Sequence, residues 1–226
     1  MGEKKQKEER SKKIKQILIV GACVLFVVLM VVSAMGSGWI TGLAVIKPGD
    51  AVVLDYTLYN PDGKAIVTSD QQLWKAGAAT GTGPLLTKQL SIVANQSYAK
   101  GLYPVPVYTS SGNQQFAVFT QEYTAITQGV IGMKVNEKKT IVVPARTPML
   151  QVWDASQLKR QNLSIADLRI GDLFTLGVSD NPVESATNIS SSYVRLAEVT
   201  KITADNITVD FGYPRVDISI ATVNGR

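Results

Sequence analysis

The longest apolar stretch of the chain lies near its beginning, at residues 17–35, and contains no charged residue. As a helix rising about 1.5 Å per residue it would be roughly 28 Å long, close to the ~30 Å hydrocarbon core of a bilayer. Residues 1–16, just before it, carry seven basic and three acidic side chains. Because cytoplasmic flanks are rich in lysine and arginine, the pattern predicts a single-pass protein of the cell membrane. The predicted parts are a basic cytoplasmic tail at residues 1–16, a transmembrane helix at residues 17–36 and an extracytoplasmic main domain.

Two kinds of processing compete with a permanent anchor. The small residues of Val32-Ser33-Ala34 resemble a signal-peptidase site, although the apolar run before them is longer than the usual ~7–15 residues. The segment Val20-Gly21-Ala22-Cys23 resembles a lipoprotein box, but the apolar residues after Cys23 would place a lipidated cysteine at the start of its own membrane helix. A permanent anchor is therefore the preferred interpretation, and cleavage stays open.

Beyond Ile46, apolar and polar residues alternate with a period of two, which is typical of half-buried strands. The turn sequence Asn60-Pro61-Asp62-Gly63 joins the first two predicted strands as a hairpin. Residues 70–113, rich in Gly, Thr, Ser and Gln, are interpreted as a long, partly ordered insertion. Many short strands with few helices predict an α+β fold with a mostly antiparallel sheet. A short helix is predicted at 124–131, a helix or loop at 154–161, and strands at 51–59, 64–68, 116–119, 140–144, 172–178, 193–199, 206–211 and 216–223.

The composition excludes several kinds of chemistry. The 226 residues include no histidine and a single cysteine, Cys23, which excludes histidine-based nucleophile systems, internal disulfides and thiolate metal sites. The net charge of +5 comes almost entirely from the tail, because the other 210 residues contribute +5 − 4 = +1. A near-neutral body without a basic stripe is a poor binder of nucleic acid. We therefore expect no cofactor, no metal and no nucleic-acid partner.

Three segments, in this order, resemble the FKBP-type peptidyl-prolyl cis-trans isomerases, in particular the SlyD-like and archaeal members with an insert-in-flap domain. The first is the strand and turn from Gly49 to Lys64. The second and most specific is residues 129–144, GVIGMKVNEKKTIVVP, which is similar to the family's helix, Gly-Met turn and following strand. The third runs from Val199 to Pro214. Together the three segments cover about half of residues 47–223.

The resemblance implies an FKBP-like domain at residues 47–149 and 200–223, with a sheet wrapped on a short helix and with residues 70–113 as an insertion. It also implies a small β-rich lobe, similar to the insert-in-flap domain, at residues 150–199, which in SlyD-like members holds unfolded clients. The implied function is that of a membrane-tethered prolyl isomerase (rotamase), a folding chaperone, or both. Its partners would be proline-containing or unfolded exported polypeptides.

Such an isomerase needs no acid or base. The barrier to rotation about the peptide bond, about 18–20 kcal/mol, arises from conjugation of the amide. The family's apolar pocket is thought to favour the twisted amide, which has lost that conjugation. The absence of histidine is therefore no obstacle to this reaction.

The pocket residues are carried over from the family one position at a time. Tyr56 matches the aromatic residue of the first strand. Ile66 and Val67 stand where the family usually has Phe-Asp, so an aromatic ring and a carboxylate are lost and weak activity is expected. Glu122-Tyr123 replaces the family's Val-Ile before the helix. The candidate catalytic residues are Tyr56, Ile66, Val67, Tyr123, Ile126 and Met149.

Two other interpretations stay open. In the first, an FKBP-like fold has lost catalysis and serves as a binding or assembly subunit of a membrane or cell-surface complex. In the second, an unrelated β-rich domain matches the family by chance. The candidate residues also fit a hydrophobic core, because Tyr56 lies on an alternating strand and the aliphatic residues could fill a closed pocket.

Overall fold

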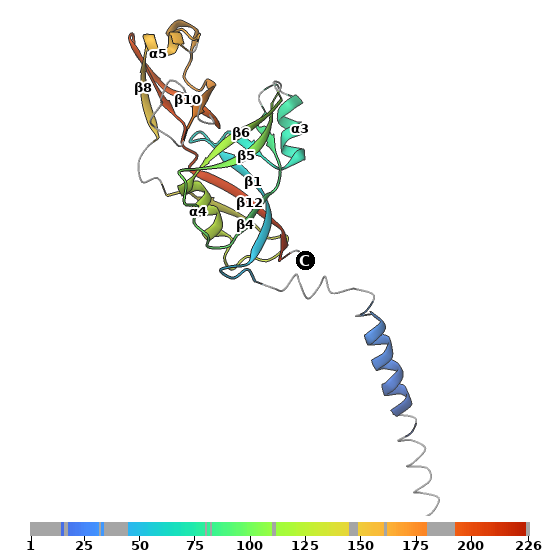
Figure 1. The fold of residues 1–226 in the computed structure, drawn as a ribbon. Coiled ribbons are helices and arrows are strands. Elements are labelled where there is room, and N and C mark those ends of the chain that lie inside the picture. The colour runs from blue at the N-terminus through green and yellow to red at the C-terminus, as the bar shows by residue number, and fades with distance from the viewer. Residues whose placement is uncertain are drawn as a thin grey trace, which may run out of the picture. The chain divides into compact units, whose positions relative to one another are not determined.

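The structure, a computed structural model, describes residues 15, 18–31, 33, 45–79, 81, 83–109, 112–144, 149–160, 162–179 and 193–224. The chain divides into two compact units, Met1–Ala44 and Val45–Arg226, and each is considered by itself. Element labels are those of Figure 1.

In the first unit, residues 15, 18–31 and 33 are helical. Across the described residues, no helix is both long enough and apolar enough to cross a membrane. The predicted anchor at residues 17–36, and the cell-membrane location that depended on it, are therefore corrected. Most of the predicted tail lies outside the described residues.

The second unit opens with the hairpin that the sequence predicts. Strand β1 (Ala51–Tyr59) pairs antiparallel with β2 (Ala65–Thr68). Asn60 fixes the turn, because its side-chain oxygen accepts the Lys64 N–H at 2.6 Å and its carbonyl accepts the Gly63 N–H at 3.0 Å. Gly63 has a φ of +79°, in the region that favours glycine. The turn residues therefore have direct structural roles.

Residues 70–113, predicted to be a partly ordered insertion, form regular elements instead. Asp70 accepts the Gln72 and Leu73 N–H groups at 2.7 and 3.2 Å and so caps α3 (Gln71–Ala79). Strand β3 then runs parallel to β2, and β4 pairs with β1. The remaining elements of this part are β3 (Leu85–Thr87), β4 (Leu90–Val93), β5 (Leu102–Thr109) and the beginning of β6 (Gly112–Phe119).

The main core lies between these strands and a helix. Helix α4 (Thr120–Gly129) begins four residues before the predicted start and buries Tyr123 and Ile126 against the sheet. Strand β7 (Lys138–Val142) follows it. The last strand, β12 (Arg215–Val223), lies between β7 and β1 and pairs antiparallel with both.

A second, smaller core belongs to the elements between β7 and β12. Strands β9, β10, β11 and β8 lie side by side in that order, each antiparallel to the next, and we call them the lobe sheet. The predicted pairing of β10 with β11 is confirmed. The smaller core, which packs against the lobe sheet, consists of Leu158, Leu176, Ala197, Val199, Ile207 and Val209. The elements are β8 (Leu150–Asp154), α5 (Ala155–Arg160), a 3₁₀ turn (Ile165–Asp167), β9 (Leu173–Val178), β10 (Tyr193–Ile202) and β11 (Asn206–Asp210).

The predicted fold class, an α+β sheet wrapped on a helix with a transmembrane helix and an inserted lobe, is wrong. The second unit is mostly β (Figure 1). One curled sheet runs in the order β7-β12-β1-β2-β3-β5-β6-β10-β11-β8. Strand β4 pairs with β1 and β9 with β10, off this path. The lobe sheet joins the rest through the parallel pairing of Val194 with Phe116. The physical reason is that β10 forms backbone hydrogen bonds with β6, so the lobe sheet and the rest of the strands form one sheet.

Candidate functional site

A shallow groove of about 180 Å³ lies where β7 ends and β8 begins. Its walls come from the β1–β2 turn, the first turn of α4 and the link between β11 and β12. Small-molecule pockets usually measure about 300–1,000 Å³, so this groove suits a single side chain rather than a whole ligand. We call it the Met149 groove, and it is lined by Pro61, Gln121, Glu122, Val143, Pro144, Met149, Asp210, Gly212, Tyr213 and Pro214.

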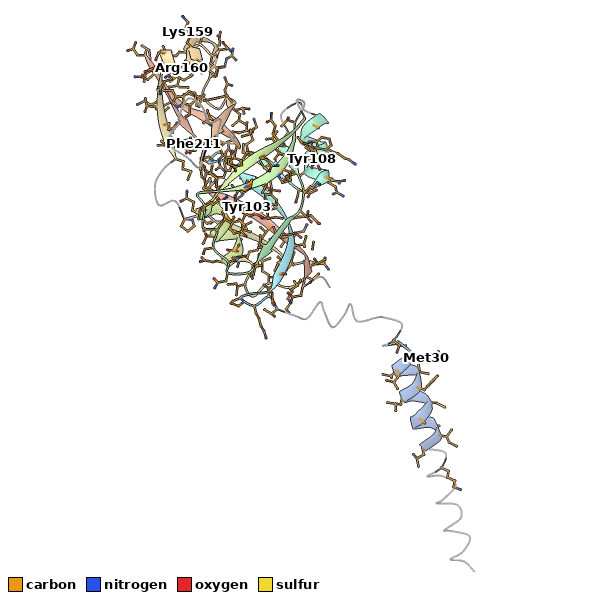
Figure 2. All side chains as sticks on the ribbon, viewed as in Figure 1. Met30, Tyr103, Tyr108, Lys159, Arg160 and Phe211 are labelled. Atoms are coloured by element: carbon orange, nitrogen blue, oxygen red, sulfur yellow. The ribbon has the colours of Figure 1, made fainter. Side chains whose placement is uncertain are left out.

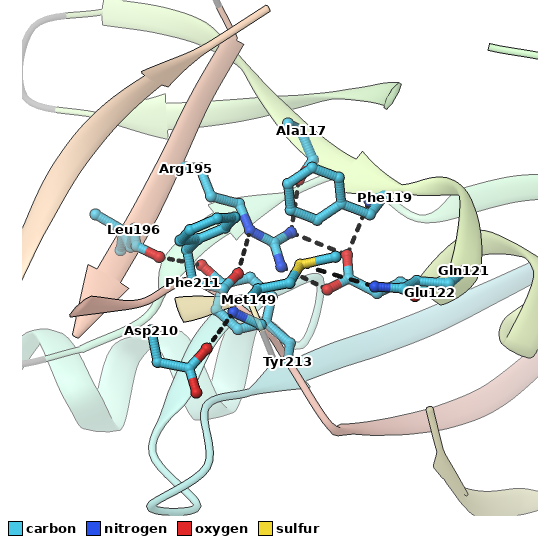
Figure 3. Close-up of polar contacts among 11 residues, drawn as sticks. Ala117, Phe119, Gln121, Glu122, Met149, Arg195, Leu196, Asp210, Phe211 and Tyr213 are labelled. Carbon is cyan, nitrogen blue, oxygen red and sulfur yellow. Dashed lines mark hydrogen bonds and ion pairs between the residues drawn. The ribbon is translucent and has the colours of Figure 1, made fainter. Parts of the chain in front are cut away.

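A buried ion pair lies at one wall of the groove. The guanidinium of Arg195 donates to both carboxylate oxygens of Glu122, one of them at 2.9 Å, and the two side chains are 0% and 1% exposed. Arg195 also donates to the carbonyl oxygens of Ala117 at 2.7 Å and Phe211 at 2.8 Å (Figure 3). A buried charge is tolerated where it is paired and hydrogen-bonded in this way.

Aromatic rings complete the surroundings of Arg195. Its guanidinium carbon lies 3.7 Å from the ring centroid of Tyr213 and 4.4 Å from that of Phe119. Tyr213 donates its hydroxyl to the Leu196 carbonyl at 2.9 Å and stacks on Phe116. Burial raises the pKa of Tyr213 above its ordinary value, so the ring stays neutral. The groove therefore has a rigid wall whose polar groups are already satisfied.

Met149 is held at the mouth of the groove by both its side chain and its backbone. The Gln121 amide lies 3.7 Å from the Met149 sulfur, and the Phe211 N–H donates to the Met149 carbonyl at 3.1 Å (Figure 3). Of the six candidate residues predicted from the sequence, Met149 is the one that lines the groove. Glu122 lines the groove too.

The other five candidate residues lie in the main core. Their side chains are at most 4% exposed, and Tyr56 also borders the smaller of the two hollows described below: Tyr56, Ile66, Val67, Tyr123 and Ile126. The Tyr56 hydroxyl donates to the Thr87 side chain at 3.3 Å, and burial raises its pKa well above the ordinary value of 10.0. Tyr123 stacks on Tyr103, which lies beside α4 in Figure 2, at 4.4 Å between ring centroids.

Acidic side chains lie at the other side of the groove. Asn60 donates to the Glu198 carboxylate at 2.5 Å, and Glu198 is 4% exposed. Burial, together with hydrogen bonding to Asp62, raises the pKa of Glu198 from 4.5 to about 7. Asp210, which lines the groove, stands directly opposite Glu198 in the β10–β11 ladder.

The strand that leads out of the groove lies at the edge of the sheet. β8 is the last strand in the order, and its Leu150 and Val152 are 48% and 63% exposed. Since their partners are Asp210 and Thr208, both face away from the lobe core. The described part of the chain places no strand on the other side of β8.

Two larger hollows lie beside α3 on the outer face of the sheet, with volumes of about 450 and 940 Å³. The hollows share two carboxylates that already accept hydrogen bonds, Asp55 from Ser69 and Gln89, and Asp70 from the N–H groups at the start of α3. The larger hollow has a mainly polar lining, whereas Tyr56, Tyr59, Leu73 and Ile218 add apolar surface to the smaller one.

Arg195 is the residue of this region that sequence reasoning missed. It lies near the start of β10, and residues 197 and 199 of the same strand are apolar and buried. An arginine at an inward position of an alternating strand signals a buried partner, and Glu122, where the FKBP resemblance leads one to expect an apolar residue, is the matching signal.

The sequence matches no protein-family model, and no curated protein is significantly similar to it. Within the described residues, no group of three or more His, Cys, Asp or Glu side chains is arranged to hold a metal ion. The resemblance to the FKBP family therefore rests on the three sequence segments alone.

Proposed function

We propose that the chain is an FKBP-like binding protein for unfolded or extended polypeptide segments, including segments that contain proline. The observation that carries this proposal is the continuity of the Met149 groove with an exposed apolar edge strand. Met149 lines the groove, and the next residue, Leu150, begins β8.

Each half of this surface suits a different part of a polypeptide. In an antiparallel pair the backbone groups of successive residues point alternately toward and away from the partner strand. Because Met149 bonds to Phe211, the backbone groups of Leu150 and Val152 point away from β11. An extended segment can add to such an edge through its own backbone. The groove would then take one small apolar side chain, such as a proline ring.

Binding can be measured by fluorescence anisotropy with a dye-labelled, permanently unfolded polypeptide and the full-length chain. We expect Val152→Lys to weaken binding about tenfold, because contact with a valine side chain contributes about 1.5 kcal/mol and lysine blocks edge pairing. The matched control is Ile170→Lys, which is 68% exposed in the same region but lies outside β8 and the groove. Equal affinities of the two variants would contradict the proposal.

Prolyl isomerisation is the second candidate function, and the apolar lining around Met149 and Tyr213 favours it. The reaction requires an environment that stabilises the twisted amide and no proton transfer. We expect weak acceleration of prolyl isomerisation in a peptide assay, because Tyr56, Ile66 and Val67 are buried and unavailable to a substrate.

The isomerase assay also distinguishes an active isomerase from a binding or assembly subunit that lacks catalysis. Met149→Lys should abolish any acceleration, since a charge would then occupy the groove, while Ile170→Lys should leave it unchanged. Polypeptide binding without any acceleration would make the chain a binding or assembly subunit that lacks catalysis.

A further inference from the structure

The Met149 groove is asymmetric in charge, and this asymmetry bears on which polypeptides it takes. Among the described residues that line it there are two carboxylates, Glu122 and Asp210, and no lysine or arginine. The charge of Glu122 is neutralised by Arg195. One oxygen of Asp210 accepts the Gly212 N–H at 2.8 Å, and the ion pairs found within the described residues involve Glu122 and Asp217 instead.

Two further carboxylates, Glu198 and Asp62, extend this negative charge beyond the groove. Glu198 stands directly opposite Asp210 on the neighbouring antiparallel strand, so the two side chains lie on the same face of the sheet. Asp62, in the turn that carries Pro61, lies close enough to Glu198 to raise its pKa. The same face carries the exposed Leu150 and Val152.

Like charges placed together without cations are unfavourable, and an opposite charge from a partner would relieve the repulsion. We infer that the groove selects polypeptide segments in which the apolar residue that enters it is flanked by a lysine or arginine, whose charge pairs with Asp210, Glu198 and Asp62. This inference rests on the proposed polypeptide-binding function and names the class of segment that the site takes.

The titration of Glu198 makes the selection depend on pH. The groups that face Glu198 are Asn60 and Asp62 from the β1–β2 turn and Asp210 from β11. With a pKa of about 7, Glu198 gains its negative charge as the pH rises from about 6 to about 8. A cationic segment should therefore bind more tightly at the higher pH.

The test compares three dye-labelled peptides that differ at one position. Each contains Val-Pro, and the residue that follows is lysine, glutamine or glutamate. With the full-length chain at low salt, we expect the lysine peptide to bind about fivefold more tightly than the glutamine peptide, and the glutamate peptide more weakly than both. Raising the salt concentration should reduce these differences, because exposed charges are screened.

Substitutions then assign the preference to the carboxylates. Asp210→Asn retains an oxygen for the Gly212 N–H and should reduce the ratio of lysine-peptide to glutamine-peptide affinity to about twofold or less. The matched control, Asp205→Asn, removes the same charge from the far end of the β10–β11 hairpin and should keep the full preference. Glu198→Gln should abolish the tightening of the lysine peptide between about pH 6 and about pH 8.

The outcomes separate this inference from the function on which it rests. Equal binding of the lysine and glutamine peptides would overturn the charge selection and leave polypeptide binding intact. A lysine preference that survives Asp210→Asn and Glu198→Gln unchanged would also overturn it. Binding of none of the three peptides would overturn both.

Discussion

At the scale of single residues, Arg195 determines how the Met149 groove is built. Its guanidinium connects β10, β6 and the end of β11 through one carboxylate and two carbonyl oxygens. A lysine could not make these bonds, because its single ammonium group lacks the planar fork of donors. The side chain therefore holds the lobe sheet against α4.

We expect Arg195→Met to lower the free energy of unfolding by about 3–5 kcal/mol, because the buried Glu122 carboxylate then keeps only the Phe119 N–H and loses its cationic partner. Urea denaturation measures the change. The double variant Arg195→Met with Glu122→Gln should recover part of the loss, since no buried charge remains. The control is Arg215→Met, whose ion pair with Asp217 is long, at 3.7 Å, and about 40% exposed on both sides, so its loss should cost about 1 kcal/mol or less.

Glu198 makes stability depend on pH in the opposite sense to most carboxylates. Its folded pKa of about 7 lies above the ordinary 4.5, so between these values the folded protein keeps a proton that the unfolded chain has released. Stability should therefore fall as the pH rises from about 4.5 to about 7, by at most about 3 kcal/mol.

Glu198→Gln should remove this slope, because glutamine resembles the neutral acid and can still accept from Asn60. The variant should match the parent protein near pH 5 and be more stable near pH 8 in urea denaturation at both pH values. Identical pH profiles for the two proteins would show that Glu198 is not the titrating group.

At the scale of secondary-structure elements, the alternating pattern predicts a strand well where one face of the strand is buried and the other is exposed. The bounds of β1 agree with the predicted 51–59, and the β10–β11 hairpin pairs as expected. Helix α3 and strands β3 to β5 were missed, because β3 and β4 have only 3 and 4 residues and β5 contains Pro104 and Pro106, which argue against a strand. They become regular through tertiary pairing, which local composition does not encode.

Helix α3 depends on a close approach between two glycines. A Cβ on Gly83 would lie 2.6 Å from the Gly77 carbonyl carbon and 2.7 Å from the Ala78 nitrogen. We expect Gly83→Ala to cost about 1–3 kcal/mol of stability, because the backbone itself must move. Gly101→Ala is the control, since its Cβ would meet nothing within 4 Å and its cost should stay within about 0.5 kcal/mol. Urea denaturation of both variants checks the difference.

At the scale of the whole molecule, the sequence did not predict the order of the strands. The decisive pairings join distant segments, such as Val52 with Val223 and Val194 with Phe116. The candidate site was predicted only at Met149, because the other family positions carry side chains that pack in the core. Local periodicity does not show that an arginine from one strand, Arg195, is buried against a carboxylate far away in the sequence, Glu122.

Because the second unit has a main core and a separate smaller core, we expect its two parts to differ in stability. Leu158→Ala removes a fully buried side chain from the smaller core and should raise amide hydrogen exchange in β8 and β11 while β1 and β12 keep their protection. Ile126→Ala, in the main core, should lower protection in β1 and β12. Equal loss of protection everywhere in both variants would mean that the two cores unfold as one.

The position of β12 has a consequence for how the protein is made. Its 9 residues come last among the strands, yet they fill the space between β7 and β1. At a synthesis rate of about 5–20 residues per second, β1 and β7 leave the ribosome seconds before the strand that covers their edges. During that interval each edge can pair with another nascent chain. The period of greatest aggregation risk therefore comes late in translation, and it ends when β12 emerges and pairs.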